Sequence, residues 1–310
     1  MNPEVNAIPE SHVAQQAAAP AALSTTRPLY WSVRRELWEY RSIYIAPLAV
    51  AAVFLFGYII SLTVLRHHMH DLSSLSPMQQ HLLFQQPYSF VSLLLMLTTF
   101  LIAVFYSLDA LYGERRDRSL LFWKSLPVSD LTAVLSKALI PLVVIPLVTF
   151  VITFITQLIM LLMGSVILPM NGVSAATLWN NLSFFQMALM LLYHLLAIHG
   201  LWYAPVYAWL LLVSSWARRT PFLWAVLPPI VLIVVEFVTF RTTYLGSLLA
   251  NRISGGSEGA AFTIGAMSME PMSHISPIHF LLSSGLWIGL AIAAIFLAIA
   301  IQMRRYRESI

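Results

Sequence analysis

Histidines and an aspartate gather just after the first apolar run of this 310-residue chain, and their side chains are ones that bind metals. The residues are His67, His68, His70 and Asp71, with His81 further on. Imidazoles at this spacing can hold zinc or copper. The chain has no cysteine, which excludes thiolate ligands, and nothing fixes a fourth ligand. A solvated loop and a metal site both fit, and we favour the loop.

Three further polar residues fall inside apolar runs. Glu236 is the one acid well inside such a run, and a carboxylate in lipid indicates function because leaving it there costs roughly a few kcal/mol. An interfacial acid, paired with Arg241 for example, explains it equally well. His194 and His199 are separated by roughly 500° of helical turn, so they point to different faces. We take Glu236, His194 and His199 as a possible substrate path, with interhelical packing as the alternative for the histidines.

A third group of polar residues lies between the second and third apolar runs. It comprises Glu114, Arg115, Arg116, Asp117 and Arg118. An apolar stretch, residues 120–123, follows directly, and then Leu126 and Pro127. Pro127 ends a helix, and Ser129 is suited to cap the next one. A short amphipathic helix between two spans is suited to docking into another protein. An ordinary basic loop is the alternative, but it does not explain the apolar stretch.

Composition shows which elements must position these groups. The chain is 59% hydrophobic and 10% charged, so its solvent must be lipid. Windows of about 20 apolar residues predict six transmembrane helices and an all-α polytopic fold. The predicted spans are residues 45–65, 89–108, 138–168, 184–213, 222–240 and 278–302. The third and fourth are long, and we expect Pro141, Pro146, Gly200 and Pro205 to kink them. Short external helices are expected in the loop 241–277.

The basic residues set the expected orientation. With the N terminus inside, 14 of the 17 lysines and arginines fall in cytosolic segments, including Arg304, Arg305 and Arg307 near the C terminus. Only Arg66, Arg241 and Arg252 fall outside. Both termini are therefore expected in the cytosol, with residues 304–310 as a short tail and residues 45–303 as the transmembrane domain. The +4 net charge reflects this bias and does not indicate nucleic-acid binding.

The residues before the first span predict two further elements. Residues 1–27 are rich in Ala, Pro and Gln, and we expect a disordered cytosolic tail. Across residues 28–44, an apolar stripe recurs at three- and four-residue steps, with Arg34, Arg35 and Glu36 between its members. The stripe comprises Tyr30, Val33, Leu37, Tyr40 and Tyr44. This pattern predicts an amphipathic helix lying in the headgroup layer with its stripe toward the lipid. A straight extension of the first span is the alternative.

The segment 109–137 carries a resemblance to a known family. Its block Gly-Glu-Arg-Arg-Asp-Arg, then Leu-Pro-Val-Ser, then Ser136-Lys137 opening a long span, resembles the ABC type-2 permeases. The resemblance implies the membrane subunit of a bacterial inner-membrane exporter, working as a dimer with a second permease copy or a paralogue. It also implies that this segment is a coupling helix seated in a separate ATPase subunit. The implied coupling residues are Glu114, Arg115, Arg116, Asp117, Arg118, Leu126, Pro127 and Ser129.

The expected function follows from the resemblance. No Gly is followed by Lys, so this chain has no phosphate loop, and ATP and Mg²⁺ are expected on the partner subunit. We expect a non-enzymatic permease with no cofactor of its own. The rival is an inner-membrane enzyme or assembly factor that uses Glu236 and the histidines on lipid-linked substrates. A secondary transporter is a third possibility, but no internal repeat supports it.

Overall fold

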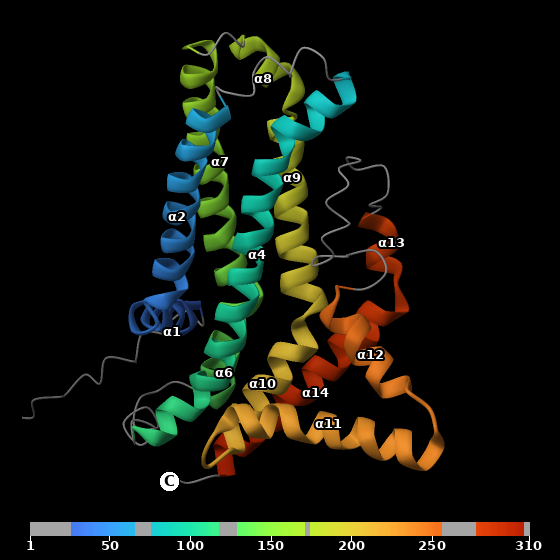
Figure 1. Ribbon diagram of the computed structural model, residues 1–310. Coiled ribbons are helices and arrows are strands. Elements are labelled where there is room, and N and C mark those ends of the chain that lie inside the picture. The colour runs from blue at the N-terminus through green and yellow to red at the C-terminus, as the bar shows by residue number, and fades with distance from the viewer. Residues whose placement is uncertain (1–25, 66–75, 118–128, 171–173, 256–276, 307–310) are drawn as a thin grey trace, which may run out of the picture.

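The computed structural model describes residues 26–65, 76–117, 129–170, 174–255 and 277–306, and within these ranges it is entirely helical, without strands (Figure 1). Six of its helical segments are long and apolar enough to cross a membrane. They are Ser42–Leu62, Leu83–Arg116, Asp130–Met170, Phe184–Trp202, Pro221–Phe240 and Ser284–Tyr306. The predicted all-α fold with six candidate spans is therefore confirmed.

The long helices of the upper part of the molecule stand upright beside one another in Figure 1. They are α2 (Ser42–Leu65), α4 (Pro77–Arg116), α7 (Ile145–Met170) and α9 (Phe184–His194). Helix α7 packs against α2, α4 and α9, and α2 also packs against α4. Tyr88, Leu95 and Met160 are fully buried between them. The short α8 (Ala175–Asn181) lies at the upper end, between α7 and α9 (Figure 1).

Two π-helical segments interrupt the long third and fourth runs where kinks were predicted. Helix α6 (Asp130–Leu139) passes through η2 (Ile140–Val144) into α7, and Pro141 in η2 has no N–H to give to the helical ladder. Helix α9 passes through η3 (Leu195–Trp202) to α10 (Ala204–Trp216). The two π segments pack together, and a Cβ placed on Gly200 would lie only 2.8 Å from the Leu142 carbonyl oxygen. Glycine is therefore required where the backbones approach.

The fourth predicted span, residues 184–213, is divided in the structure. The candidate span ends at Trp202, and α10 is a separate apolar helix that follows Tyr203. Helix α10 packs against α4 and against α14 (Ser284–Tyr306). The sequence had indicated one long kinked helix, because apolar residues continue without a break from one segment to the next.

Helix α11 (Pro221–Phe240) differs from the other spans in its packing. It runs across the lower part of Figure 1, and only Ala225 and Glu236 are buried along its length. The remaining apolar side chains are exposed and need lipid or protein to cover them. Beyond it, α12 (Tyr244–Ile253) lies in the loop where short helices were predicted. Helix α13 (Pro277–Leu282) occupies the first residues of the predicted sixth span, which begins at Ser284 in the structure.

Helix α1 (Thr26–Glu39) lies crosswise at the lower end of α2 (Figure 1). The helix breaks at Tyr40 and Arg41 before α2 begins, so the alternative of a straight extension is wrong. The expected direction of its apolar stripe is wrong for three of its five members, whereas Tyr30 and Tyr44 are 60% and 36% exposed. Val33, Leu37 and Tyr40 pack against the buried core of the protein and do not point into lipid. The stripe has a protein surface to cover, which periodicity alone does not reveal.

The outer surface of the long helices is apolar. Val53, Phe56, Val166 and Trp287 are each more than half exposed, as are many of their neighbours. Such a surface is stable only in contact with acyl chains. The chain is thus a polytopic helical membrane protein whose apolar helices contact the bilayer.

Candidate functional site

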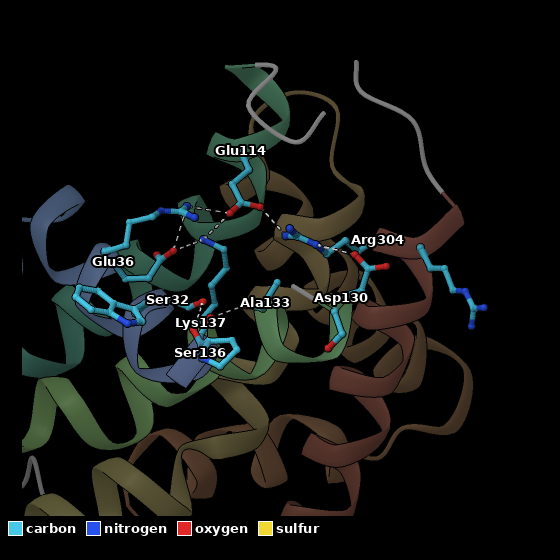
Figure 2. Close-up of a pocket in the computed structure, with 13 residues that line it drawn as sticks. Ser32, Glu36, Glu114, Asp130, Ala133, Ser136, Lys137 and Arg304 are labelled. Atoms are coloured by element: carbon cyan, nitrogen blue, oxygen red, sulfur yellow. Dashed lines mark hydrogen bonds and ion pairs between the residues drawn. The ribbon is translucent and has the colours of Figure 1, made fainter. Parts of the chain in front are cut away.

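Charged side chains from four helices meet at the end of the bundle that carries α1. Figure 2 shows Glu36 of α1, Glu114 in the last turn of α4, Lys137 of α6 and Arg304 in the last turn of α14 pointing toward one another. Asp130, in the first turn of α6, joins them through Arg304. Each is held on a helix, so the positions of the charges are fixed by how the helices pack.

Lys137 is the centre of this group and is only 2% exposed. Its ammonium nitrogen lies 2.8 Å from Glu36 Oε1 and 3.3 Å from Glu114 Oε1. The second oxygen of Glu36 accepts a hydrogen bond from the Tyr106 hydroxyl at 2.8 Å. Lys137 thus ties helix α1 to the end of α4 through one buried cation.

Glu114 connects the group to α14 and back to α1. Its Oε2 accepts from Arg304 Nη1 at 2.5 Å, and its Oε1 accepts from Arg35 Nη2 at 3.1 Å. Arg304 also reaches Asp130 Oδ1 at 3.2 Å. Arg35 is less enclosed: burial opposes its charge, but the carboxylates of Glu36 and Glu114 outweigh that cost and raise the pKa of Arg35.

We call Arg35, Glu36, Glu114, Asp130, Lys137 and Arg304 the ion cluster. Its three acids balance its three cations, which is the condition under which buried charges are tolerated. Removing one member of such a group leaves an uncompensated charge. The cost is typically about 3–5 kcal/mol.

A second tyrosine supports the α1 side of the cluster. Burial first, and then the carboxylates of Asp109 and Glu36, raise the pKa of Tyr40 well above its ordinary value. Its hydroxyl therefore stays protonated and donates to Asp109 Oδ2 at 3.1 Å. The ring packs edge-on against Tyr106, with the centroids 4.9 Å apart. These contacts fix the break between α1 and α2 against α4.

A cavity of about 620 Å³ opens beside the ion cluster (Figure 2). The cluster lines one part of it, and Pro28, Trp31, Ser32, Ser129, Ala133, Ser136 and Arg305 line the rest. The cavity therefore lies between α1, the start of α6 and the end of α14, against the place where α4 ends. It is a concave surface of mixed charge that can receive a polar segment of another molecule.

The predicted coupling residues divide into buried and exposed ones. Glu114 and Arg115 are 6% and 5% exposed, so they do not form the charged outer surface that the sequence suggested. Arg115 donates through Nη2 to the carbonyls of Ser214 and Ala217, at 2.6 and 2.8 Å, and so holds the end of α10. Helix α4 continues through Arg116, so Glu114 and Arg115 lie within the helix and pack against its neighbours.

Arg116 and Asp117 do lie on the surface. Their side chains are 56% and 62% exposed and pair with each other at 3.0 Å. Ser129 caps α6 as predicted, and its hydroxyl accepts from the Thr132 N–H at 3.1 Å. Arg118, Leu126 and Pro127 lie outside the described residues. The link between α4 and α6 thus leaves and returns directly beside the ion cluster.

Glu236 accepts hydrogen bonds from residues that the sequence did not indicate as its partners. One carboxylate oxygen accepts from the Thr242 hydroxyl at 2.8 Å and from the Tyr244 N–H at 2.7 Å. The other accepts from the Leu245 N–H at 2.8 Å. Tyr244 and Leu245 are the first residues of α12, so the carboxylate caps that helix and meets its positive end. These contacts account for an acid at this depth without a substrate.

The two histidines of the possible substrate path do not share a site with Glu236. His194 Nδ1 lies 2.9 Å from the Met190 carbonyl oxygen, one turn back in α9. His199, fully buried in η3, packs edge-on against Tyr203 with the centroids 5.4 Å apart. Packing within the bundle, the alternative drawn from the sequence, agrees with both positions.

The sequence left open whether the histidines and the aspartate after the first span bind a metal. His67, His68, His70 and Asp71 lie outside the described residues, and His81 falls in the first part of α4. Across the described ranges, no group of three His, Asp or Glu side chains is placed to hold a metal ion.

Sequence reasoning did not identify Glu36, Asp130 or Arg304 as members of a site. One signal was available for Glu36, which lies three residues after Val33 and four before Tyr40, on the face expected to be apolar. A charge on that face requires a buried partner. Nothing in the sequence near Glu36 identifies Lys137, 101 positions away, as that partner.

Comparison with known proteins identified no relative of this chain. No protein-family model, no curated protein and no solved structure matches this chain.

Proposed function

We propose that this chain is the membrane permease subunit of an ATP-binding cassette exporter, driven by a separate ATPase subunit. The observation that carries the proposal is the position of the ion cluster. It fastens the last turn of α4 and the first turns of α6 to each other, on either side of the link that resembles the coupling segment of ABC type-2 permeases. A force applied to that link therefore reaches several spans at once.

The path of that force is short. From Glu114 it reaches α14 through Arg304 and α1 through Arg35 and Lys137. From Lys137 it continues along α6 into η2, which packs against η3. π-helical segments and prolines are places where helices bend, so η2 and η3 are suited to convert movement of the link into movement of α7 and α9. Closure of the ATPase dimer would in this way drive alternating access.

The proposal assigns different tasks to the predicted coupling residues. Arg116 and Asp117 are exposed and are the ones available to a partner groove, with Arg118 following in the chain. Glu114 and Arg115 hold the end of α4 in place from inside. ATP and Mg²⁺ belong to the partner, which is expected in two copies with two permease chains in the bacterial inner membrane, with both termini cytosolic.

The test is retention of the ATPase encoded by a neighbouring reading frame with Walker motifs. Arg116→Glu reverses an exposed charge, so the variant should fold and insert normally while losing the copurifying ATPase or its coupling to transport. A reversed charge at an interface places like charges opposite one another and weakens the complex. Arg219→Glu, an exposed reversal at the turn between α10 and α11, is the matched control and should retain the ATPase.

Two results would contradict the proposal. One is an Arg116→Glu chain that holds a full complement of ATPase and transports at the wild-type rate. The other is a wild-type chain that binds no protein with Walker motifs. The rival function, an enzyme or assembly factor acting on lipid-linked substrates, would then take precedence.

A further inference from the structure

Helix α1 has a second face besides its buried one, and the first residue of this face, Trp31, also lines the cavity beside the ion cluster. Val33, Glu36 and Tyr40 face the protein body. Trp31, Arg34 and Trp38 follow one another at steps of three and four residues, so they share one side of the helix. The two indoles are 59% and 69% exposed, a large apolar area for so short a helix. We call these three residues the α1 outer face.

Arg34 lies between the two rings. Its guanidinium carbon is 5.2 Å from the Trp31 ring centroid and 5.0 Å from that of Trp38. In the described part of the chain no carboxylate lies within ion-pair distance of Arg34. Its neighbour Arg35, by contrast, is engaged by Glu36, Glu39 and Glu114. The outer face therefore presents one cation without an ion-pair partner among the described residues, held by cation–π contacts with both indoles.

The position of the outer face in the fold indicates what covers it. Helix α1 ends one short turn before α2, whose candidate span begins at Ser42. Ile45 and Leu48, in the first turns of that span, are 53% and 51% exposed and belong to the lipid-facing surface. Exposed indoles at the end of a span are typical of the headgroup layer of a bilayer.

We propose that the α1 outer face binds the headgroup of an anionic phospholipid, with Arg34 contacting the phosphate and the Trp31 and Trp38 rings resting among the adjoining glycerol and acyl carbons. A guanidinium matches the geometry of a phosphate with paired N–H groups, and the two rings hold it ready for that contact. Anionic lipids are favoured over zwitterionic ones because a choline group would place a second cation beside Arg34. This site does not depend on the proposed transport function.

The test is lipid retention by the purified full-length chain in native mass spectrometry. The protein is mixed in detergent with equal amounts of phosphatidylglycerol and phosphatidylcholine of the same acyl chains, and the bound ratio is measured. The wild-type chain should retain phosphatidylglycerol preferentially, and Arg34→Gln should lower that preference about fivefold, the contribution of one arginine near a membrane surface. Trp38→Ala should lower it as well, with the charge intact.

Two controls distinguish loss of a specific lipid site from a general change of charge and from misfolding. Arg219→Gln removes one exposed cation elsewhere and should leave the lipid ratio unchanged. Arg34→Gln should keep the wild-type melting temperature, because the ion cluster does not include it. Equal retention of both lipids by the wild-type chain, or a ratio that Arg34→Gln leaves unchanged, would overturn the proposal. An Arg34→Gln chain that keeps its lipid preference but loses the ATPase would mark the face as a protein contact and would also overturn it.

Discussion

The Lys137 ammonium lies 2.8 Å from the Glu36 carboxylate, and both side chains are only 2% exposed. One residue belongs to the helix that precedes the first span and the other to the helix that opens the third. Their contact makes helix α1 part of the helical bundle. A buried pair of this kind is stable because further partners satisfy both charges: Tyr106 and Arg35 at Glu36, and Glu114 at Lys137.

Removal of the central cation should therefore be severe. Lys137→Met removes the more deeply buried of the two cations that Glu36 and Glu114 share, leaving only Arg35 between them. We expect about 3–5 kcal/mol of destabilisation, measured as loss of folded protein in thermal melts in detergent. Adding Glu36→Gln to Lys137→Met removes the uncompensated acid and should recover part of the loss. A Lys137→Met chain as stable as the wild type would show that the ion cluster contributes nothing to folding.

The contact between the two π segments predicts a second stability effect. Gly200→Ala places a Cβ 2.8 Å from the Leu142 carbonyl oxygen, a backbone atom that cannot move aside, so η2 and η3 must separate. We expect a lower melting temperature, equivalent to about 1–3 kcal/mol. Gly57→Ala is the matched control, because its Cβ meets nothing within 4 Å. Equal melting of both variants would contradict the close approach.

The capping role of Glu236 can be read from hydrogen exchange. Glu236→Gln removes the charge that meets the first N–H groups of α12, so the amides of Tyr244 and Leu245 should exchange faster, by about fivefold. Thr242→Val removes one of the three hydrogen bonds and should have a smaller effect. Altered transport by Glu236→Gln with unchanged exchange would instead favour a substrate path.

The orientation expected from the basic residues can be tested in this cysteine-free background. Cysteines introduced at Ser73 and Ser257 should react with an impermeant thiol reagent applied outside, and one at Ser119 should not. The reason is the 14-to-3 distribution of lysine and arginine between the two sides. Labelling of Ser119→Cys from outside would contradict either the expected orientation or the two spans expected before this residue.

Local patterns in the sequence determined the elements of this protein. Long apolar runs predict membrane helices because a backbone in lipid must satisfy its own hydrogen bonds, and six candidate spans were found. The start of α6 at Ser129 and the kinks near Pro141 and Gly200 were predicted because capping and helix interruption depend on residues a few positions apart. The α1 helix was likewise evident from its periodicity.

Only the tertiary structure decided what those elements face. The stripe Val33, Leu37 and Tyr40 covers protein and not lipid, because an amphipathic pattern shows that a face is buried without showing against what. Glu114 and Arg304 meet although they are 190 positions apart, and Glu236 caps a helix that begins beyond a turn. Periodicity fixes which residues share one side of a helix. Which helix lies opposite depends on how all the helices pack together, and on that packing rest the ion cluster and every function that it supports.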